Sequence, residues 1–159
     1  LAGVACPVEI VAGGQTRQES VALGLARLDG LEPDATVLVH DAARAFMPVS
    51  VFGRLIAAVE HHDAAIPVLP VVDTIVAGLG GDVTYLHRPS LGAVQTPQAF
   101  RIGVLRDAHE RAAADGLEAT DDGSLTVHYG YSLATVEGDP LGEKITYPQD
   151  LEAAERRLA

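Results

Sequence analysis

The segment from Asp41 to Arg44 has residue types that could bind a phosphorylated ligand. An acid and a base flank two alanines, and the apolar run 36–39 ends one residue before this segment, with His40 between them. That run predicts a strand buried on both faces, and ligands of open α/β sheets bind beyond the carboxyl ends of the strands. Because alanine is small, the backbone N–H of Ala42 can come close to a ligand. Taken alone, the segment also fits a polar turn with an aspartate cap and a solvated Arg44.

Two glycines near the start form a second feature suited to phosphate. Gly13 and Gly14 lie between the apolar run 8–12, which predicts a short strand, and a helix start marked by Thr16 and Glu19 in capping-box spacing. The N-terminus of a helix presents free N–H groups to anions. Two glycines before a helix are more often only a turn.

Lys144 is a third such feature. It follows the glycine-rich loop 138–142 and is the only lysine among the 11 basic residues of the chain. A compact ammonium group suits a phosphate contact that the planar arginine side chain does not fit. The order of the three features along the chain carries more weight than any one of them.

Composition limits the classes of function. The chain has 159 residues, 48% hydrophobic residues and a formal net charge of −11. These values predict one globular domain and argue against nucleic acid or an anionic membrane as a partner. No apolar run approaches the roughly 20 residues of a membrane span, and residues 1–6 lack the basic start of a signal peptide. The single cysteine, Cys6, is expected to be a buried, inert thiol in a cytoplasmic protein.

Hydrophobic periodicity predicts a layered α/β fold in which strands and helices alternate. Strands are predicted at 8–12, 36–39, 66–72, 93–96, 133–136 and 144–146. Helices are predicted after Thr16, from Pro48 with Val51, Leu55, Ile56 and Val59 on the apolar face, over 101–115 up to Gly116, from Thr120 to His128, and over 148–159.

A hairpin interrupts this alternation. The segments 74–76 and 83–86 flank a glycine-rich turn, which is typical of a β-hairpin. We expect it to project as an arm over about residues 71–92. Such an arm could form a dimer, although an ordinary edge hairpin fits the pattern equally well.

Taken together, these motifs resemble one enzyme family. The quoted motifs are Asp41 to Arg44, Asp73-Thr74, Arg88, Thr96-Pro97-Gln98, Thr120-Asp121-Asp122, Gly138 to Leu141 and Lys144-Ile145-Thr146. In this order they resemble 2-C-methyl-D-erythritol 4-phosphate cytidylyltransferases of the non-mevalonate isoprenoid pathway, over essentially the whole chain from Gly13.

The resemblance implies a Rossmann-like nucleotidyltransferase fold and a homodimer formed through the arm. It implies that CTP and 2-C-methyl-D-erythritol 4-phosphate react to give 4-diphosphocytidyl-2-C-methylerythritol and pyrophosphate. Mg²⁺ would be bound mainly through the nucleotide phosphates, with no metal site made by protein side chains alone. Catalysis would consist mainly of positioning and charge neutralisation.

The resemblance also implies roles for individual residues. The catalytic residues would be Lys144, Arg88 and Asp41. The nucleotide would be bound by Gly14, Ser20, Asp41, Ala42 and Lys144. The alcohol phosphate would be bound by Arg44, Thr74, Arg88, Thr96 and Thr120, with Thr74 and Arg88 reaching into the partner subunit. Simpler interpretations remain for single residues, because Thr74 suits a strand, Arg88 a solvated surface and Thr120 a helix cap.

The sequence also departs from the family. Nothing before Gly13 matches the glycine-rich loop, carrying an arginine and a lysine, that wraps the triphosphate in the family. We therefore expect this chain by itself not to turn over. Val76 and Ala45 stand where the family often has lysine and proline. A ribitol or other polyol phosphate cytidylyltransferase remains an alternative, as does a non-catalytic dimerising domain of the same fold.

The histidines show no zinc-ligand spacing. His61 and His62 are expected to close a helix, and His40 is expected to pack beside the site.

Overall fold

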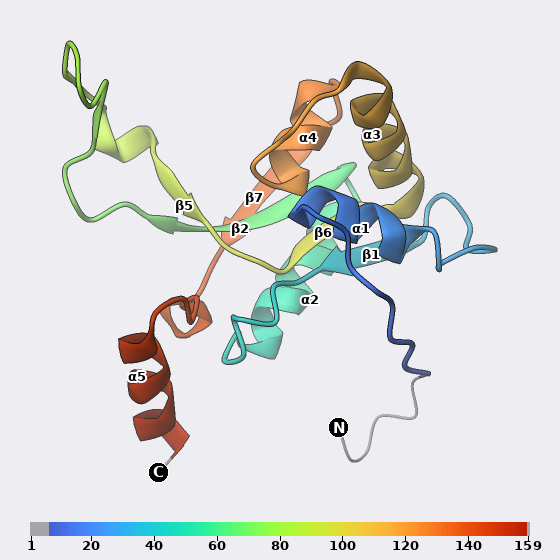
Figure 1. Ribbon diagram of the computed structural model, residues 1–159, viewed down its shortest axis with the longest axis horizontal. Coiled ribbons are helices and arrows are strands. Elements are labelled where there is room, and N and C mark those ends of the chain that lie inside the picture. The colour runs from blue at the N-terminus through green and yellow to red at the C-terminus, as the bar shows by residue number, and fades with distance from the viewer. Residues whose placement is uncertain (1–6, 159) are drawn as a thin grey trace.

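A mixed five-stranded sheet forms the centre of the protein in the computed structural model, which describes residues 7–158 (Figure 1). The strands are β1 (Thr36–Val39), β2 (Ala64–Pro70), β5 (Gly92–Val94), β6 (Gln98–Arg101) and β7 (Leu133–Glu137). Their order is β1-β6-β2-β5, and β7 pairs with β2. β6 runs antiparallel to both β1 and β2, whereas β7 runs parallel to β2.

Helices cover both faces of this sheet (Figure 1). They are α1 (Arg17–Leu25), α2 (Val49–Val59), α3 (Ile102–Asp115), α4 (Asp122–His128) and α5 (Pro148–Leu158). α1, α3 and α4 lie on one face and α2 lies on the other, while α5 lies apart from the sheet. Short 3₁₀ turns occupy Arg88–Ser90 and Pro140–Gly142. The alternation predicted from periodicity is confirmed in outline.

The register of β2 against β6 sets which residues face each layer. Ala64 lies opposite Phe100 and Ala65 lies opposite Ala99. Since neighbouring residues of a strand point to opposite faces, the two pairs enter different cores. Phe100 and Ala64 pack with Leu105 of α3, while Ala65 and Ala99 pack against α2.

The predicted arm is a separate two-stranded hairpin. β3 (Val76–Ala77) pairs antiparallel with β4 (Thr84–Tyr85), and residues 77–90 are exposed. Gly78 begins the turn with a φ of +83°, a conformation that favours glycine. Figure 1 shows the hairpin projecting well away from the helices and the central sheet.

Several local predictions are wrong. Residues 8–12 and 144–146 form no strand, although Ile145 donates one backbone hydrogen bond to Ala43. β6 is absent from the predicted strands, because Pro97 indicates that the preceding strand ends there. Ile56 is 44% exposed rather than on the apolar face of α2.

Two further features concern the ends of the chain and membranes. Cys6 and Ala159, which the sequence places in an apolar run and in the last helix, lie outside the described residues. Within residues 7–158, no helix combines the length and apolar character that crossing a membrane requires.

The α3 core gives a stability prediction. Leu105 is fully buried, so Leu105→Ala should lower the free energy of unfolding by about 2–5 kcal/mol, through lost burial and the cavity left behind. The matched control is Leu158→Ala, since Leu158 is 76% exposed and should lose less than about 0.5 kcal/mol. Urea denaturation of both variants measures the difference, and equal midpoints would contradict the assigned core.

Candidate functional site

A cavity of about 570 Å³ lies beyond the carboxyl end of β1. Its size is within the range of small-molecule sites. Several of the residues predicted from the sequence line it, namely Asp41, Arg44, Thr96, Thr120 and Lys144. Residues to which the sequence assigned no role also line it, among them Arg17, Gln95, Gln98, Asp121 and Ser124.

The carboxylate of Asp41 is the point where the charged groups of the cavity meet. Lys144 Nζ donates to Asp41 Oδ2 at 3.0 Å, and Arg17 Nε donates to Oδ1 at 3.5 Å. Partial burial would raise the pKa of Asp41, but Lys144 and then Arg17 outweigh it and hold the pKa below its ordinary value. Asp41 is therefore a carboxylate that stays ionised between two cations.

Thr96 fixes the backbone at Asp41. Its hydroxyl accepts a hydrogen bond from the N–H of Asp41 at 3.0 Å and lies 3.1 Å from His40 Nδ1. The side chain of Thr96 is largely buried at the edge of the cavity, where it holds the end of the strand. His40 packs edge-on against Phe52, beside the site as predicted. Burial lowers the pKa of His40 and so favours the neutral ring.

Arg17 links Asp41 to a carboxylate in the interior. Arg17 is the first residue of α1, whose N-cap Thr16 accepts a hydrogen bond from the N–H of Glu19. Its Nη1 donates to Asp122 Oδ2 at 2.6 Å. Asp122 is the first residue of α4, a position set by the capping box of Asp121 and Ser124. Two helix starts on different segments thus form one ion pair.

Asp122 is 1% exposed and also contacts His109, whose Nε2 lies 2.9 Å from Oδ1. Burial would raise the pKa of this carboxyl group. The hydrogen bond with His109 and the charge of Arg17 outweigh that effect and leave the pKa below its ordinary value. A charge buried this deeply needs such partners.

Arg44 is anchored on the other side of the cavity. The N–H of Arg44 donates to Asp41 O, which closes a turn, and Nη1 donates to the carbonyl of Gly142 at 2.7 Å. Burial lowers the pKa of Arg44. Within residues 7–158, its buried Nε has no hydrogen-bond partner. A buried donor of this kind is costly unless an acceptor reaches it.

The loop before Lys144 is held by Gln95. The side chain of Gln95 accepts from Asp139 N at 3.0 Å and donates to Asp139 O at 2.9 Å. Gly142 packs so closely on Met47 that a Cβ there would clash with the methionine side chain. Together with the bond from Ile145 to the loop after β1, these contacts fix the backbone on both sides of Lys144.

Thr120 and Asp121 lie at the start of α4. Asp121 is the N-cap, so the cap predicted for the Thr120–Asp122 segment belongs to this aspartate. Its Oδ2 also accepts from Gln98 Nε2 at 2.6 Å, and Gln98 Oε1 accepts from the N–H of Gly123. The hydroxyl of Thr120 lies 3.4 Å from that of Ser124 and lines the cavity.

Other predicted residues do not line the cavity. The N–H of Gly14 donates to the hydroxyl of Ser20 at 3.0 Å, so the two residues brace the start of α1. Ala42 is exposed. Thr74 and Arg88 lie exposed on the arm, where Arg88 Nη1 donates to the carbonyl of Val72.

The sequence assigns no role to Arg17, Asp122 or His109, although Asp122 belongs to the motif at residues 120–122. Arg17 resembles any polar residue of a first helical turn, and Asp122 resembles one that favours a helix dipole. The 105-residue separation of Arg17 and Asp122 is closed because α1 and α4 both pack against α3. Within residues 7–158, no group of three or more His, Cys, Asp or Glu side chains could hold a metal ion.

Comparisons with known proteins identify the family of this chain. The sequence profile described as IspD, 2-C-methyl-D-erythritol 4-phosphate cytidylyltransferase, matches residues 2–159. The chain is 51% identical over 139 residues to a bifunctional enzyme IspD/IspF of Sphingopyxis alaskensis, covering 87% of this chain and 35% of that protein. It is 42% identical to a 2-C-methyl-D-erythritol 4-phosphate cytidylyltransferase of Geotalea uraniireducens, covering 94% of this chain and 64% of that protein.

Solved structures give the same result. The crystal structure of 2-C-methyl-D-erythritol 4-phosphate cytidylyltransferase from Thermus thermophilus superposes with a TM-score of 0.82 at 42% identity, covering 99% of this chain and 78% of that one. The predicted Rossmann-like nucleotidyltransferase fold is thereby confirmed. The chain spans about a third of the length of the bifunctional relatives and about two thirds of the Geotalea enzyme. The chain belongs to the 2-C-methyl-D-erythritol 4-phosphate cytidylyltransferase family.

Proposed function

We propose that the protein containing this chain joins CTP to 2-C-methyl-D-erythritol 4-phosphate, giving 4-diphosphocytidyl-2-C-methylerythritol and pyrophosphate. The observation that carries the proposal is the Asp41 carboxylate held between Lys144 and Arg17 at a cavity that Arg44 also lines. Three cations around one such carboxylate suit a ligand with several phosphate groups. The names of the relatives support the same reaction.

In this reaction an oxygen of the alcohol phosphate attacks the α-phosphorus of CTP. A new P–O bond forms, the bond from the α-phosphorus to the bridging oxygen breaks, and pyrophosphate leaves with the electron pair. Negative charge gathers on the phosphate oxygens as the leaving group departs. Lys144 and Arg44 would stabilise that charge, while Asp41 would keep Lys144 oriented toward it.

Mg²⁺ fits this donor set only together with the nucleotide. Mg²⁺ commonly uses one or two carboxylates plus substrate phosphates, and Asp41 is the cavity carboxylate that contacts both Lys144 and Arg17. Asp41 would therefore help to hold an ion bound mainly through the triphosphate. Such an ion would neutralise phosphate charge.

The single cysteine of the chain favours a cytoplasmic setting for this activity.

The arm would act on the active site of a second subunit. Thr74 and Arg88 are exposed and belong to an arm that projects away from the sheet of its own chain (Figure 1). We propose a homodimer in which these two residues bind the alcohol phosphate in the partner's cavity. Among residues 7–158, the guanidinium of Arg88 donates to one backbone carbonyl, which leaves donors for a phosphate.

The decisive experiment measures pyrophosphate release by the protein as its gene encodes it, with CTP and Mg²⁺. We expect turnover with 2-C-methyl-D-erythritol 4-phosphate and at least about 100-fold less with ribitol phosphate, since unmatched polar groups are strongly rejected. Turnover with ribitol phosphate alone would instead identify a polyol phosphate enzyme. Absence of turnover with both would favour a non-catalytic dimerising domain.

Replacing Lys144 tests the charge at the cavity. Lys144→Ala should lower kcat about 100-fold, because the charge that develops on the phosphates loses a fixed cation. Half of the Lys144 side chain is exposed, so the fold should remain intact by circular dichroism. Arg157→Ala is the control, since it removes an exposed cation that pairs with Glu143, outside the cavity. A Lys144→Ala enzyme with the wild-type kcat would refute the phosphate role.

Replacing Arg88 tests the arm. Arg88→Ala should raise KM for the alcohol phosphate about tenfold or more and leave KM for CTP unchanged, because only one substrate loses a charged hydrogen bond. Steady-state kinetics with each substrate varied in turn measure both constants. A rise in KM for CTP alone would contradict the assignment of the arm.

Mixing two impaired variants tests which subunit Arg88 serves. Equal amounts of Arg88→Ala and Lys144→Ala subunits are exchanged and assayed at an alcohol phosphate concentration well below KM. About a quarter of the wild-type rate should come from restored sites, because half of randomly paired dimers are mixed and each contains one intact site. If Arg88 served its own subunit, both sites of every mixed dimer would carry one defect, and mixing would restore no intact site.

A further inference from the structure

Two of the three guanidinium nitrogens of Arg17 donate hydrogen bonds to carboxylates, and the third is available to a ligand. Nε donates to Asp41 and Nη1 donates to Asp122. The remaining nitrogen, Nη2, is buried and has no hydrogen-bond partner within residues 7–158. A buried N–H without an acceptor costs free energy, so its presence beside a cavity points to an acceptor that arrives with a ligand. Arg17 itself lines that cavity.

The anchor of Arg17 is built more firmly than a surface ion pair. The Asp122 side chain is 1% exposed and accepts from Arg17 at 2.6 Å. This geometry is a short, charge-assisted hydrogen bond. Burying such a carboxylate stabilises a fold little, since the loss of hydration offsets most of the attraction. The role of the Asp122 carboxylate therefore lies in the position in which it holds the guanidinium of Arg17.

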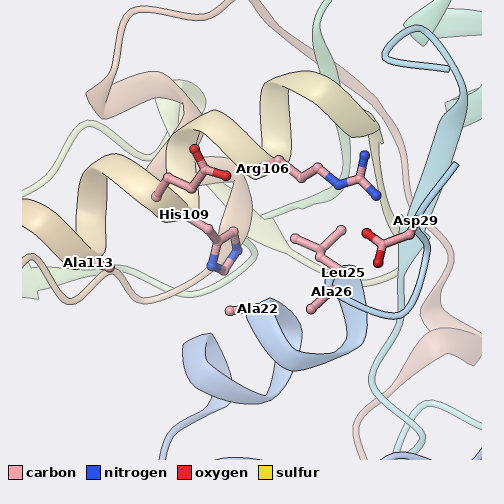
Figure 2. A pocket seen from close by; sticks show the side chains of 8 residues that line it. Ala22, Leu25, Ala26, Asp29, Arg106, His109 and Ala113 are labelled. Atoms are coloured by element: carbon pink, nitrogen blue, oxygen red, sulfur yellow. The ribbon is translucent and has the colours of Figure 1, made fainter. Parts of the chain in front are cut away.

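His109 holds the other oxygen of Asp122. It comes from α3, and its Nε2 lies 2.9 Å from Asp122 Oδ1. Figure 2 shows the ring directed from α3 toward Ala22 of α1, at a second cavity of about 570 Å³ between these helices. The Asp122 carboxylate is thus held by hydrogen bonds from Arg17 on one oxygen and His109 on the other. It cannot rotate without losing either the histidine or Arg17.

From these contacts we propose that Arg17 binds a phosphate group of the nucleotide, and that Asp122 and His109 are positioning residues that hold its guanidinium for this contact. The inference rests on the proposed function in that the anion is taken to be the triphosphate of CTP. Lys144, Asp41, Arg17, Asp122 and His109 then form one continuous chain from the cavity to the interior.

The test compares Arg17→Lys, Asp122→Asn and the double variant in the protein as its gene encodes it. Arg17→Lys keeps the charge but cannot contact both carboxylates, and Asp122→Asn keeps the shape but loses the anchoring charge. Each should raise KM for CTP about tenfold or more and leave KM for the alcohol phosphate within about twofold. The double variant should be no worse than the poorer single variant, because both changes remove the same arrangement. His109→Gln, which retains a donor, should rescue most of the affinity lost in His109→Ala.

Matched controls lie at the opposite end of the sheet. Asp63 accepts hydrogen bonds from Ser132, and Arg101 lies opposite Thr36 at the start of β1. Asp63→Asn and Arg101→Lys are therefore expected to change the melting temperature at most, with both KM values retained. If Asp122→Asn behaved in the same way, or if the effects of Arg17→Lys and Asp122→Asn were additive, the proposal would be overturned.

A binding measurement separates this inference from the proposed function. Inorganic pyrophosphate with Mg²⁺ is titrated into the wild type and into Arg17→Lys by calorimetry. Binding by the wild type that weakens about tenfold in Arg17→Lys would support the anion contact even if no alcohol phosphate were turned over. Equal affinities, or no binding by the wild type, would overturn it. The Arg17 side chain is about one-third exposed, so this variant is expected to fold even if Asp122→Asn does not.

Discussion

The site depends on one carboxylate that is shared by cations from distant parts of the chain. Asp41 follows the strand β1, Arg17 begins the helix α1, and Lys144 lies 103 residues beyond Asp41. Lys144 and Arg17 are far apart in sequence. They come together because both donate hydrogen bonds to the carboxylate of Asp41. With both pairs formed, the pKa of Asp41 stays below its ordinary value, so the attraction persists at neutral pH. The segments that carry these residues are therefore held together at the cavity by charge and elsewhere by packing.

The ligand that we propose is acidic, like the protein, and the same arrangement would let the protein attract it. The chain has a formal net charge of −11, which would repel a nucleotide at long range. Around the cavity the balance of positive and negative charge differs from that of the whole chain, because Arg17, Arg44 and Lys144 converge there. Two of these side chains have a buried nitrogen with no acceptor among residues 7–158. Local donors that lack acceptors count for more at short range than the screened net charge of the whole surface.

Sequence patterns predict what depends on neighbouring residues and miss what depends on pairing. The strand at 36–39 and the helix closed by Gly116 follow from local periodicity and capping, and both are present. β6 escapes such patterns because its pairing with β1 and β2, on either side, outweighs the break suggested by Pro97. Residues 8–12 have strand propensity, yet they pair with no strand among residues 7–158. In the site, Asp41 and Lys144 stand out by their position, whereas Arg17 and Asp122 look like ordinary residues of helix starts.

The difference between the lysine and the two arginines follows from how each is held. Arg17 donates to carboxylates through two of its nitrogens, and the guanidinium of Arg44 donates to a backbone carbonyl, so both planes are set before a ligand arrives. The ammonium group of Lys144 contacts Asp41, and about half of the lysine side chain is exposed. It can keep that contact and still direct its other N–H groups toward a phosphate. Arginines of fixed orientation would then define where the anion binds, while a lysine able to shift by a bond rotation would follow the charge as the P–O bonds change. An arginine at 144 would carry the same charge, but its rigid fork would be aligned with only one stage of the reaction.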